Sequence, residues 1–197
     1  MKKTLTLILT VLLAISFVFG FSSCDDDKEY DGPADGTVVE NEDGTLSRTL
    51  IGLTFRLTPD FEERNYSGYT HSYTNGPADF LVAAMSYQQL EEATYDEMPD
   101  PWPTNVYDYS RHFVIINNIG LKYWSYDEAN NIATIKHVFK YTGEDAGMLE
   151  DEYVHYVIMD NGEAIFFITY SCEISERETY EPLFNYWSSL LHLRKVK

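Results

Sequence analysis

Four strand-like stretches between residues 121 and 172, joined by short polar turns, constrain this chain more than any other feature. The predicted strands cover Leu121–Tyr126, Ile132–Tyr141, Leu149–Met159 and Ala164–Cys172. Asn161-Gly162 lies between the last two, and an Asn-Gly pair accommodates the positive φ angles that a tight hairpin turn requires. Strands joined by such short turns run antiparallel. The pattern therefore predicts an antiparallel meander built from local contacts.

The first half of the chain adds further predicted strands. They cover Thr37–Glu40, Leu46–Ile51, Leu53–Leu57, Gly68–Thr74 and Asp79–Tyr87. The first two are the arms of a hairpin predicted about Asp43-Gly44. The last contains an unbroken apolar run, Phe80 to Met85, which is typical of a strand in the interior of a sheet.

Two helices are predicted outside these strands. The first begins at Asn105, and its apolar face carries Val106, Tyr109, Phe113 and Ile116. Spacings of three and four are typical of an amphipathic helix. The second is expected over Glu176–Arg194, with its regular part starting near residue 181, so that Pro182 lies in the first turn. Helices that are separate from an antiparallel sheet indicate the α+β fold class.

The amino terminus has the parts of a secretory signal. A basic start precedes a nearly unbroken apolar run from Leu5 to Phe21, and small residues follow. A membrane-spanning helix is the alternative, although the run falls just short of the roughly 20 apolar residues that a span needs. Phe21-Ser22-Ser23-Cys24 resembles the bacterial lipobox, with Phe where Leu is usual. The resemblance implies that residues 1–23 are a signal peptide and that Cys24 becomes the lipid-modified first residue of the mature protein.

An acidic cluster, Asp25-Asp26-Asp27-Lys28-Glu29, follows this cysteine directly. It resembles the export signal of surface lipoproteins in the Bacteroides group. That implies an outer-membrane lipoprotein, acylated with palmitate-type chains and displayed at the cell surface. A plain acidic tether on a protein that faces the periplasm is the alternative. We expect residues 24–47 to form the tether, including the hairpin, and residues 48–197 to form one folded domain.

The formal net charge of −18 limits the classes of partner. Such a field repels nucleic acid and anionic lipid headgroups. We therefore expect no nucleic-acid partner, and contact with the membrane through the N-terminal lipid rather than through a basic patch.

Four stretches resemble the PsbP-like family and together cover roughly Arg48 to Arg194. They are Ile51–Pro59, the hairpin around Asn75-Gly76, the Asn161-Gly162 hairpin into Ile165–Cys172, and the ending Tyr180–Leu190. The resemblance implies an antiparallel sheet with helices packed on its faces. It also implies a non-catalytic binding, assembly or accessory role, because members of the family share no catalytic motif. We accordingly expect no enzyme activity, no catalytic residue and no cofactor.

Aromatic residues are dense in the middle of the chain, and four of them are candidate binding residues. These are Trp102, which lies in a proline-rich loop, and Tyr107, Tyr109 and Trp124. Tyr and Trp are favoured at interfaces because they bury a large area at little entropic cost. The expected ligand is an envelope protein or a glycan. The alternative is that the tyrosines line a sheet face with their hydroxyls toward water.

A metal site is the rival hypothesis. If Ile132–Tyr141 pairs with Leu149–Met159 about a turn near residue 145 or 146, His137 lies opposite residue 154 or 155. In the second register, His137 and His155 are cross-strand neighbours close enough to share a zinc ion, which would suit a metal-assisted hydrolase. No obvious third ligand accompanies them, and two ring-packed histidines in an aromatic sheet face are the alternative.

Overall fold

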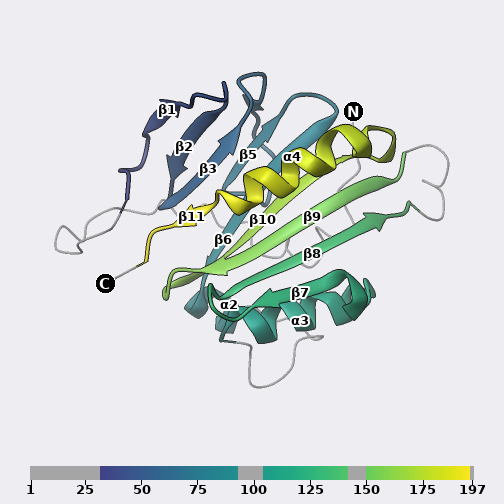
Figure 1. Cartoon of the computed structure of the whole chain (residues 1–197). Coiled ribbons are helices and arrows are strands. Elements are labelled where there is room, and N and C mark those ends of the chain that lie inside the picture. Colours follow the sequence, from purple (N-terminus) through teal and green to yellow (C-terminus); the bar gives the residue numbers. More distant parts are fainter. Residues whose placement is uncertain (1–31, 93–103, 142–149, 196–197) are drawn as a thin grey trace.

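The computed structural model describes residues 32–92, 104–141 and 150–195, and these form two antiparallel sheets with helices packed against them (Figure 1). The strands are β1 (Val38–Glu40), β2 (Leu46–Leu50), β3 (Leu53–Leu57), β4 (Glu62–Glu63), β5 (His71–Thr74), β6 (Ala78–Ser86), β7 (Trp124–Asp127), β8 (Ile132–Phe139), β9 (Glu152–Asp160), β10 (Ala164–Glu173) and β11 (His192–Leu193). The helices of the described residues are α2 (Tyr87–Glu92), α3 (Val106–Ile116) and α4 (Arg177–Ser189), and η2 (Leu121–Tyr123) and η4 (Ile174–Glu176) are 3-10 turns. This arrangement confirms the predicted α+β class.

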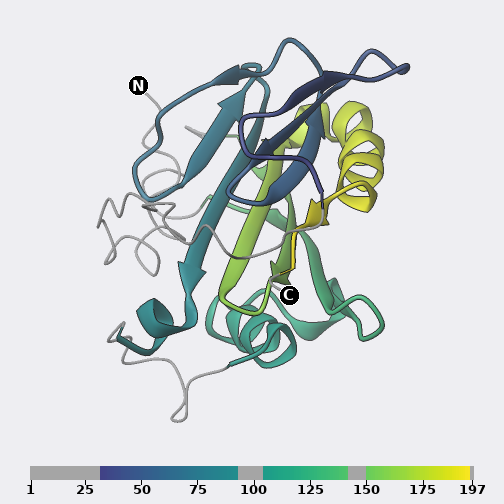
Figure 2. The ribbon, with the colours of Figure 1, turned by 90° about the vertical axis from the view of Figure 1, so that its left-hand side faces the viewer.

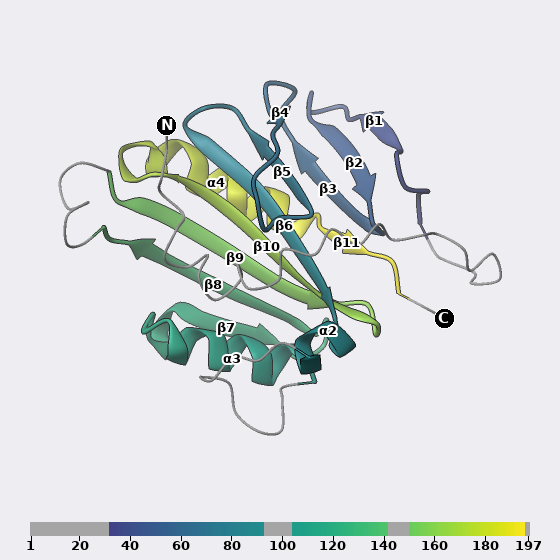
Figure 3. The same cartoon turned by 180° about the vertical axis from the view of Figure 1, so that it is seen from behind.

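The larger sheet has seven strands in the order β4-β5-β6-β10-β9-β8-β7 (Figure 3). Its second half is the predicted meander, in which β7, β8, β9 and β10 pair in succession. The apolar strand β6 pairs with β10 along its whole length, for example Ala84 with Phe166, so it lies in the interior of the sheet as predicted. Both faces of β10 are buried, which explains why its sequence is almost continuously apolar.

The predicted turn at Asn161-Gly162 joins β9 to β10. The side-chain oxygen of Asn161 accepts hydrogen bonds from the backbone N–H groups of Glu163 and Ala164, at 3.0 and 2.9 Å. Gly162 takes a positive φ of 93°, whereas Asn161 does not take one. The turn therefore needs glycine at one position and uses asparagine for its hydrogen-bonding side chain.

The smaller sheet has four strands in the order β1-β2-β3-β11. The predicted hairpin about Asp43-Gly44 forms, with Val38 opposite Arg48. Because β2 pairs in turn with β3, the hairpin is part of the folded body and the sheet already begins at Val38. Ile51 and Gly52 make the tight turn between β2 and β3, both at positive φ.

The end of the chain differs from the prediction of a helix over Glu176–Arg194. Helix α4 ends at Ser189, and the chain then forms β11, where Leu193 pairs with Leu53. The physical reason is burial, because this pairing places Leu193 in the core. Pro182 lies inside α4 rather than in its first turn, since the helix already begins at Arg177.

Two smaller differences also have local causes. The segment predicted as a strand from Leu121 begins with η2, and β7 starts only at Trp124. The strand predicted to reach Tyr87 ends one residue earlier, at the start of α2. There the backbone N–H of Ser86 donates to the side chain of Gln89 and the N–H of Gln89 donates to the Ser86 hydroxyl, which is a capping box.

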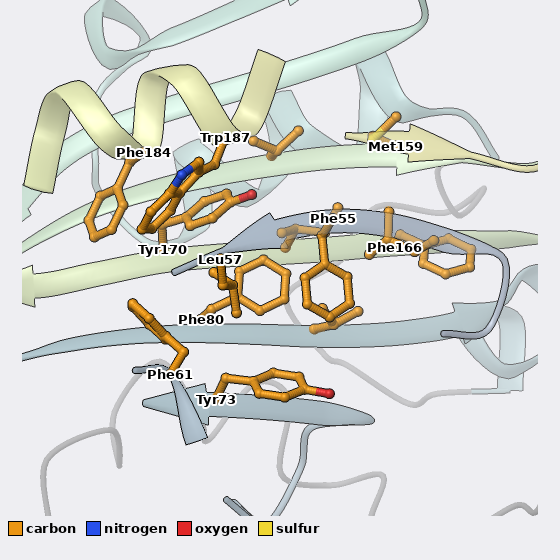
Figure 4. Packing of buried hydrophobic residues seen from close by; sticks show 14 of the residues in the cluster. Phe55, Leu57, Phe61, Tyr73, Phe80, Met159, Phe166, Tyr170, Phe184 and Trp187 are labelled. Carbon is orange, nitrogen blue, oxygen red and sulfur yellow. The ribbon is translucent and has the colours of Figure 1, made fainter. Parts of the chain in front are cut away.

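Each face of the large sheet carries its own core. On one face, α4 and the smaller sheet lie side by side, which Figure 2 shows from the edge. Figure 4 shows Phe184 and Trp187 pointing from α4 toward Tyr170, and the ring of Phe80 packs against both Tyr170 and Phe55 of β3. On the other face, α3 packs against β8 and β9 and forms the second core. Within the described ranges, no helix has the length and apolar character needed to cross a membrane.

Candidate functional site

The two candidate metal ligands, His137 and His155, point to opposite faces of the large sheet. His137 pairs with Val154, and His155 pairs with Lys136. The register with His137 opposite residue 154 is therefore the correct one of the two, and the register that would make the histidines neighbours is wrong. Because successive residues of a strand face opposite sides, a shift of one residue separates the two rings. The structure does not bring them together for a shared zinc ion.

Each histidine is packed among aromatic rings. The ring of His137 lies 5.8 Å from the ring of Tyr156 on the α3 face, and the ring of His155 lies 5.9 Å from that of Tyr170 on the α4 face. Burial, together with the nearby charge of Lys136, lowers the pKa of His155 to about 3. Among the described residues, no group of three or more His, Cys, Asp or Glu side chains could hold a metal ion.

The four predicted binding residues have different positions. Trp102 lies outside the described residues. Tyr109 is 4% exposed and belongs to the core under α3, so the prediction that it lies on a binding surface is wrong. Its spacing from Val106 and Phe113 puts it on the apolar face of the helix. Tyr107 and Trp124 are the two that the structure brings together at the surface.

Tyr107 and Trp124 form an aromatic cluster with a third residue, Tyr126. The ring of Tyr107 meets those of Trp124 and Tyr126 edge to face, at centroid distances of 5.4 and 5.1 Å. Tyr107 is 42% exposed, and the other two rings are half-buried. Edge-to-face pairs of this kind hold rings in fixed orientations, so the cluster presents a rigid aromatic surface.

Hydrogen bonds to Ser110 and Asn131 hold two rings of this cluster in place. The indole N–H of Trp124 donates to the hydroxyl of Ser110 at 2.9 Å, and that hydroxyl donates to the Tyr107 carbonyl at 3.1 Å. The Tyr126 hydroxyl lies 2.9 Å from the side-chain oxygen of Asn131. Ser110 and Asn131 are positioning residues that sequence reasoning missed, because their partners lie on other elements or across a turn.

Exposed apolar side chains extend the cluster along the molecule. Tyr107, Arg111 and Ile115 recur every four residues on the outer side of α3, and Ile115 is 51% exposed. The neighbouring turn η2, which contacts α3, exposes Leu121 and Tyr123. We call these residues, together with Trp124 and Tyr126, the α3–β7 surface. It lies at one edge of the large sheet, at the bottom of Figure 1.

Comparisons with known proteins give fold similarity only. No protein-family model and no curated protein matches this sequence. A solution structure of cyanobacterial PsbP (CyanoP) from Synechocystis sp. PCC 6803 superposes with a TM-score of 0.51 at 10% identity, covering 82% of this chain and 98% of that one.

Two further structures align less well. A crystal structure from Bacteroides thetaiotaomicron VPI-5482 gives a TM-score of 0.41 at 14% identity and covers 73% of this chain and 46% of that one. The Saccharomyces cerevisiae Ran-binding protein Mog1p gives a TM-score of 0.45 at 10% identity and covers 76% and 95% of the two chains. The PsbP-like α+β fold of the chain rests on its similarity to cyanobacterial PsbP.

Proposed function

We propose that this protein is a lipid-anchored protein of the bacterial outer membrane, and that its folded domain has a non-catalytic binding or assembly role. The anchoring rests on the sequence alone: an apolar run, then Phe21-Ser22-Ser23-Cys24, then an acidic cluster. Cys24 and residues 1–23 lie outside the described residues. Several acyl chains, at roughly 0.8 kcal/mol per buried methylene, hold a protein stably on a bilayer.

Detergent phase partitioning tests this anchor. We expect the native protein in the detergent phase and incorporation of an alkyne analogue of palmitate. The variant Cys24→Ser should lose the label, and a product that is still labelled would contradict the assignment. The matched control is Cys172→Ser, which removes the buried core thiol and should leave labelling unchanged. Protease treatment of intact cells then distinguishes surface display from a periplasmic position.

The observation that carries the binding role is Tyr107, a ring 42% exposed yet fixed between two other rings. A rigid aromatic side chain loses little entropy when a partner covers it. Arg111 and Ile115 continue the same stripe, and Tyr and Arg are enriched among residues that dominate binding energy. The exposed aliphatic side chains beside the rings favour a protein partner over a glycan, because they add apolar area without polar groups for sugar hydroxyls.

Paired variants test the surface. We expect Tyr107→Ala combined with Ile115→Ala to abolish co-isolation of an envelope protein that the native chain retains. The control combines Tyr66→Ala with Tyr186→Ala, which removes two comparably exposed tyrosines elsewhere. Equal loss in both double variants would contradict a role for this surface. A thermal shift with oligosaccharides that disappears in the first double variant would instead assign the surface to a glycan.

A further inference from the structure

A cavity lies at the edge of the large sheet opposite to the α3–β7 surface. Its volume is about 300 Å³, at the lower end of the range for small-ligand pockets. The smaller sheet supplies Val38, Arg48 and Leu50, while Phe61, Glu63 and Tyr73 come from the β4–β5 side of the larger sheet. The cavity therefore lies in the seam between the two sheets. Figure 4 shows the rings of Phe61 and Tyr73 on this side of the core.

Arg48 is the unusual residue of this cavity. It pairs with Val38 on one side and with the core residue Phe55 on the other, so its side chain points to the inner face of the smaller sheet. Its guanidinium carbon lies 5.3 Å from the centre of the Tyr73 ring. The Nη1 atom is buried and has no hydrogen-bond partner within the part of the chain that the structure describes. No ion pair joins Arg48 to a carboxylate among those residues.

An unpaired buried guanidinium nitrogen is costly, because burial removes water without supplying an acceptor. The planar guanidinium fork matches a carboxylate, which can accept two parallel hydrogen bonds. Most of the remaining wall is aliphatic or aromatic, so the cavity also suits an apolar ring or short chain. The carboxylate of Glu63 at the same cavity disfavours a ligand with two negative charges.

We propose that this seam cavity binds a small organic monocarboxylate with an apolar ring or short chain, and that Arg48 pairs with its carboxylate. This site is separate from the proposed protein interface, because the two lie at opposite edges of one sheet. Failure of either proposal leaves the other intact.

Phenylacetate is the probe, titrated into the mature chain and followed by the backbone amide signals of Val38 and Arg48. We expect saturable shifts at concentrations up to about 10 mM, where even a complex with a Kd of roughly 1 mM is mostly formed. Phenylacetamide has the same shape without the charge and should bind at least about tenfold more weakly. Inorganic phosphate should not compete. An amide that binds as tightly, competition by phosphate, or the absence of saturable shifts would overturn the proposal.

Variants of two arginines on adjacent strands give the matched control. Arg48→Met keeps an unbranched stem but removes the guanidinium group and its charge, and we expect at least about tenfold weaker binding of phenylacetate. Arg56→Met makes the same change on the opposite face of the same sheet, where Arg56 lies 3.6 Å from Asp43, and should bind normally. Unchanged binding by Arg48→Met would overturn the assignment. The amide comparison tests the same claim in the native chain, so it holds even where Arg48→Met does not fold.

Discussion

Tyr153 and Tyr170 both pack against the ring of Phe184, but only the hydroxyl of Tyr153 has a hydrogen-bond partner among the described residues. Their ring centroids lie 6.4 and 5.4 Å from that of Phe184. The Tyr153 hydroxyl donates to Glu181 at 2.9 Å, whereas the Tyr170 hydroxyl is buried and has no partner in the part of the chain that the structure describes. The same change of residue should therefore have different effects at the two positions.

We expect Tyr170→Phe to leave the free energy of unfolding unchanged or to raise it by about 1 kcal/mol, because it removes an unsatisfied buried hydroxyl. Tyr153→Phe should lower it by about 1–2 kcal/mol, because it removes a hydrogen bond to a partly exposed carboxylate. Urea unfolding of both variants measures the difference. A loss at Tyr170 as large as that at Tyr153 would show that the hydroxyl is satisfied in solution.

Alanine substitutions at Gly52 and at Gly44 test the packing of Arg194 against the β2–β3 turn. Gly52 has a φ of +78°, its N–H donates to Asp35 at 2.8 Å, and its carbonyl accepts from the N–H of Arg194 at 2.9 Å. An added Cβ would lie 3.3 Å from Nε of Arg194. Gly44 has nearly the same φ, +77°, with nothing within 4 Å of an added Cβ.

We expect Gly44→Ala to cost about 1 kcal/mol, from the left-handed conformation alone. Gly52→Ala should cost more, because the same strain is combined with displacement of Arg194. Thermal unfolding of the two variants measures this difference. Equal losses would mean that the Arg194 side chain makes room for the added methyl group at no cost to the fold.

The buried ring of His155 predicts a pH dependence of stability. The folded protein holds the pKa of His155 at about 3, below the 6.5 of an exposed histidine, so the unfolded chain binds the proton more strongly. The contribution of the neutral His155 ring to the free energy of unfolding is therefore complete above about pH 6.5. It is lost as the pH falls toward 3, by up to about 1.4 kcal/mol per pH unit. Three groups face this ring: Lys136 on β8, Glu181 on α4 and Tyr170 on β10.

Urea unfolding at pH 7.5 and at pH 5.0 tests this dependence. The native protein should lose up to about 2 kcal/mol more between the two pH values than the variant His155→Phe loses. The control His192→Phe makes the same change at an exposed histidine. An identical pH dependence in all three proteins would show that His155 does not titrate as its burial requires.

The elements that are predictable from the sequence are those whose pattern is local. Helix α3 begins after Asn105, whose side chain accepts from the N–H of Asp108, and β3 has the predicted bounds. The end of α4 is not predictable in this way, because β11 forms only through pairing with β3, about 140 residues earlier in the chain. The conformation of the β2–β3 turn is also hard to predict from the sequence, because Ile51 has a positive φ and isoleucine rarely adopts that conformation.

The candidate site could likewise be predicted only in part from the sequence. Helical periodicity separates Tyr109, on the apolar face of α3, from Tyr107 on the outer face, so a high density of aromatic residues does not by itself indicate which of them are exposed. The histidine pair depended on a strand register, and a shift of one residue changes the face on which a side chain lies. Ser110 acts through a contact with β7, which only the folded chain reveals.

Photo-cross-linking in the native envelope tests the proposed binding role most directly. The cross-linker p-benzoylphenylalanine replaces Tyr107 on the α3–β7 surface or, as the control, Tyr186, which is 46% exposed on α4. We expect a discrete protein adduct from position 107 in intact cells and none of the same mass from position 186. No adduct at position 107, or the same adducts from both positions, would contradict the account.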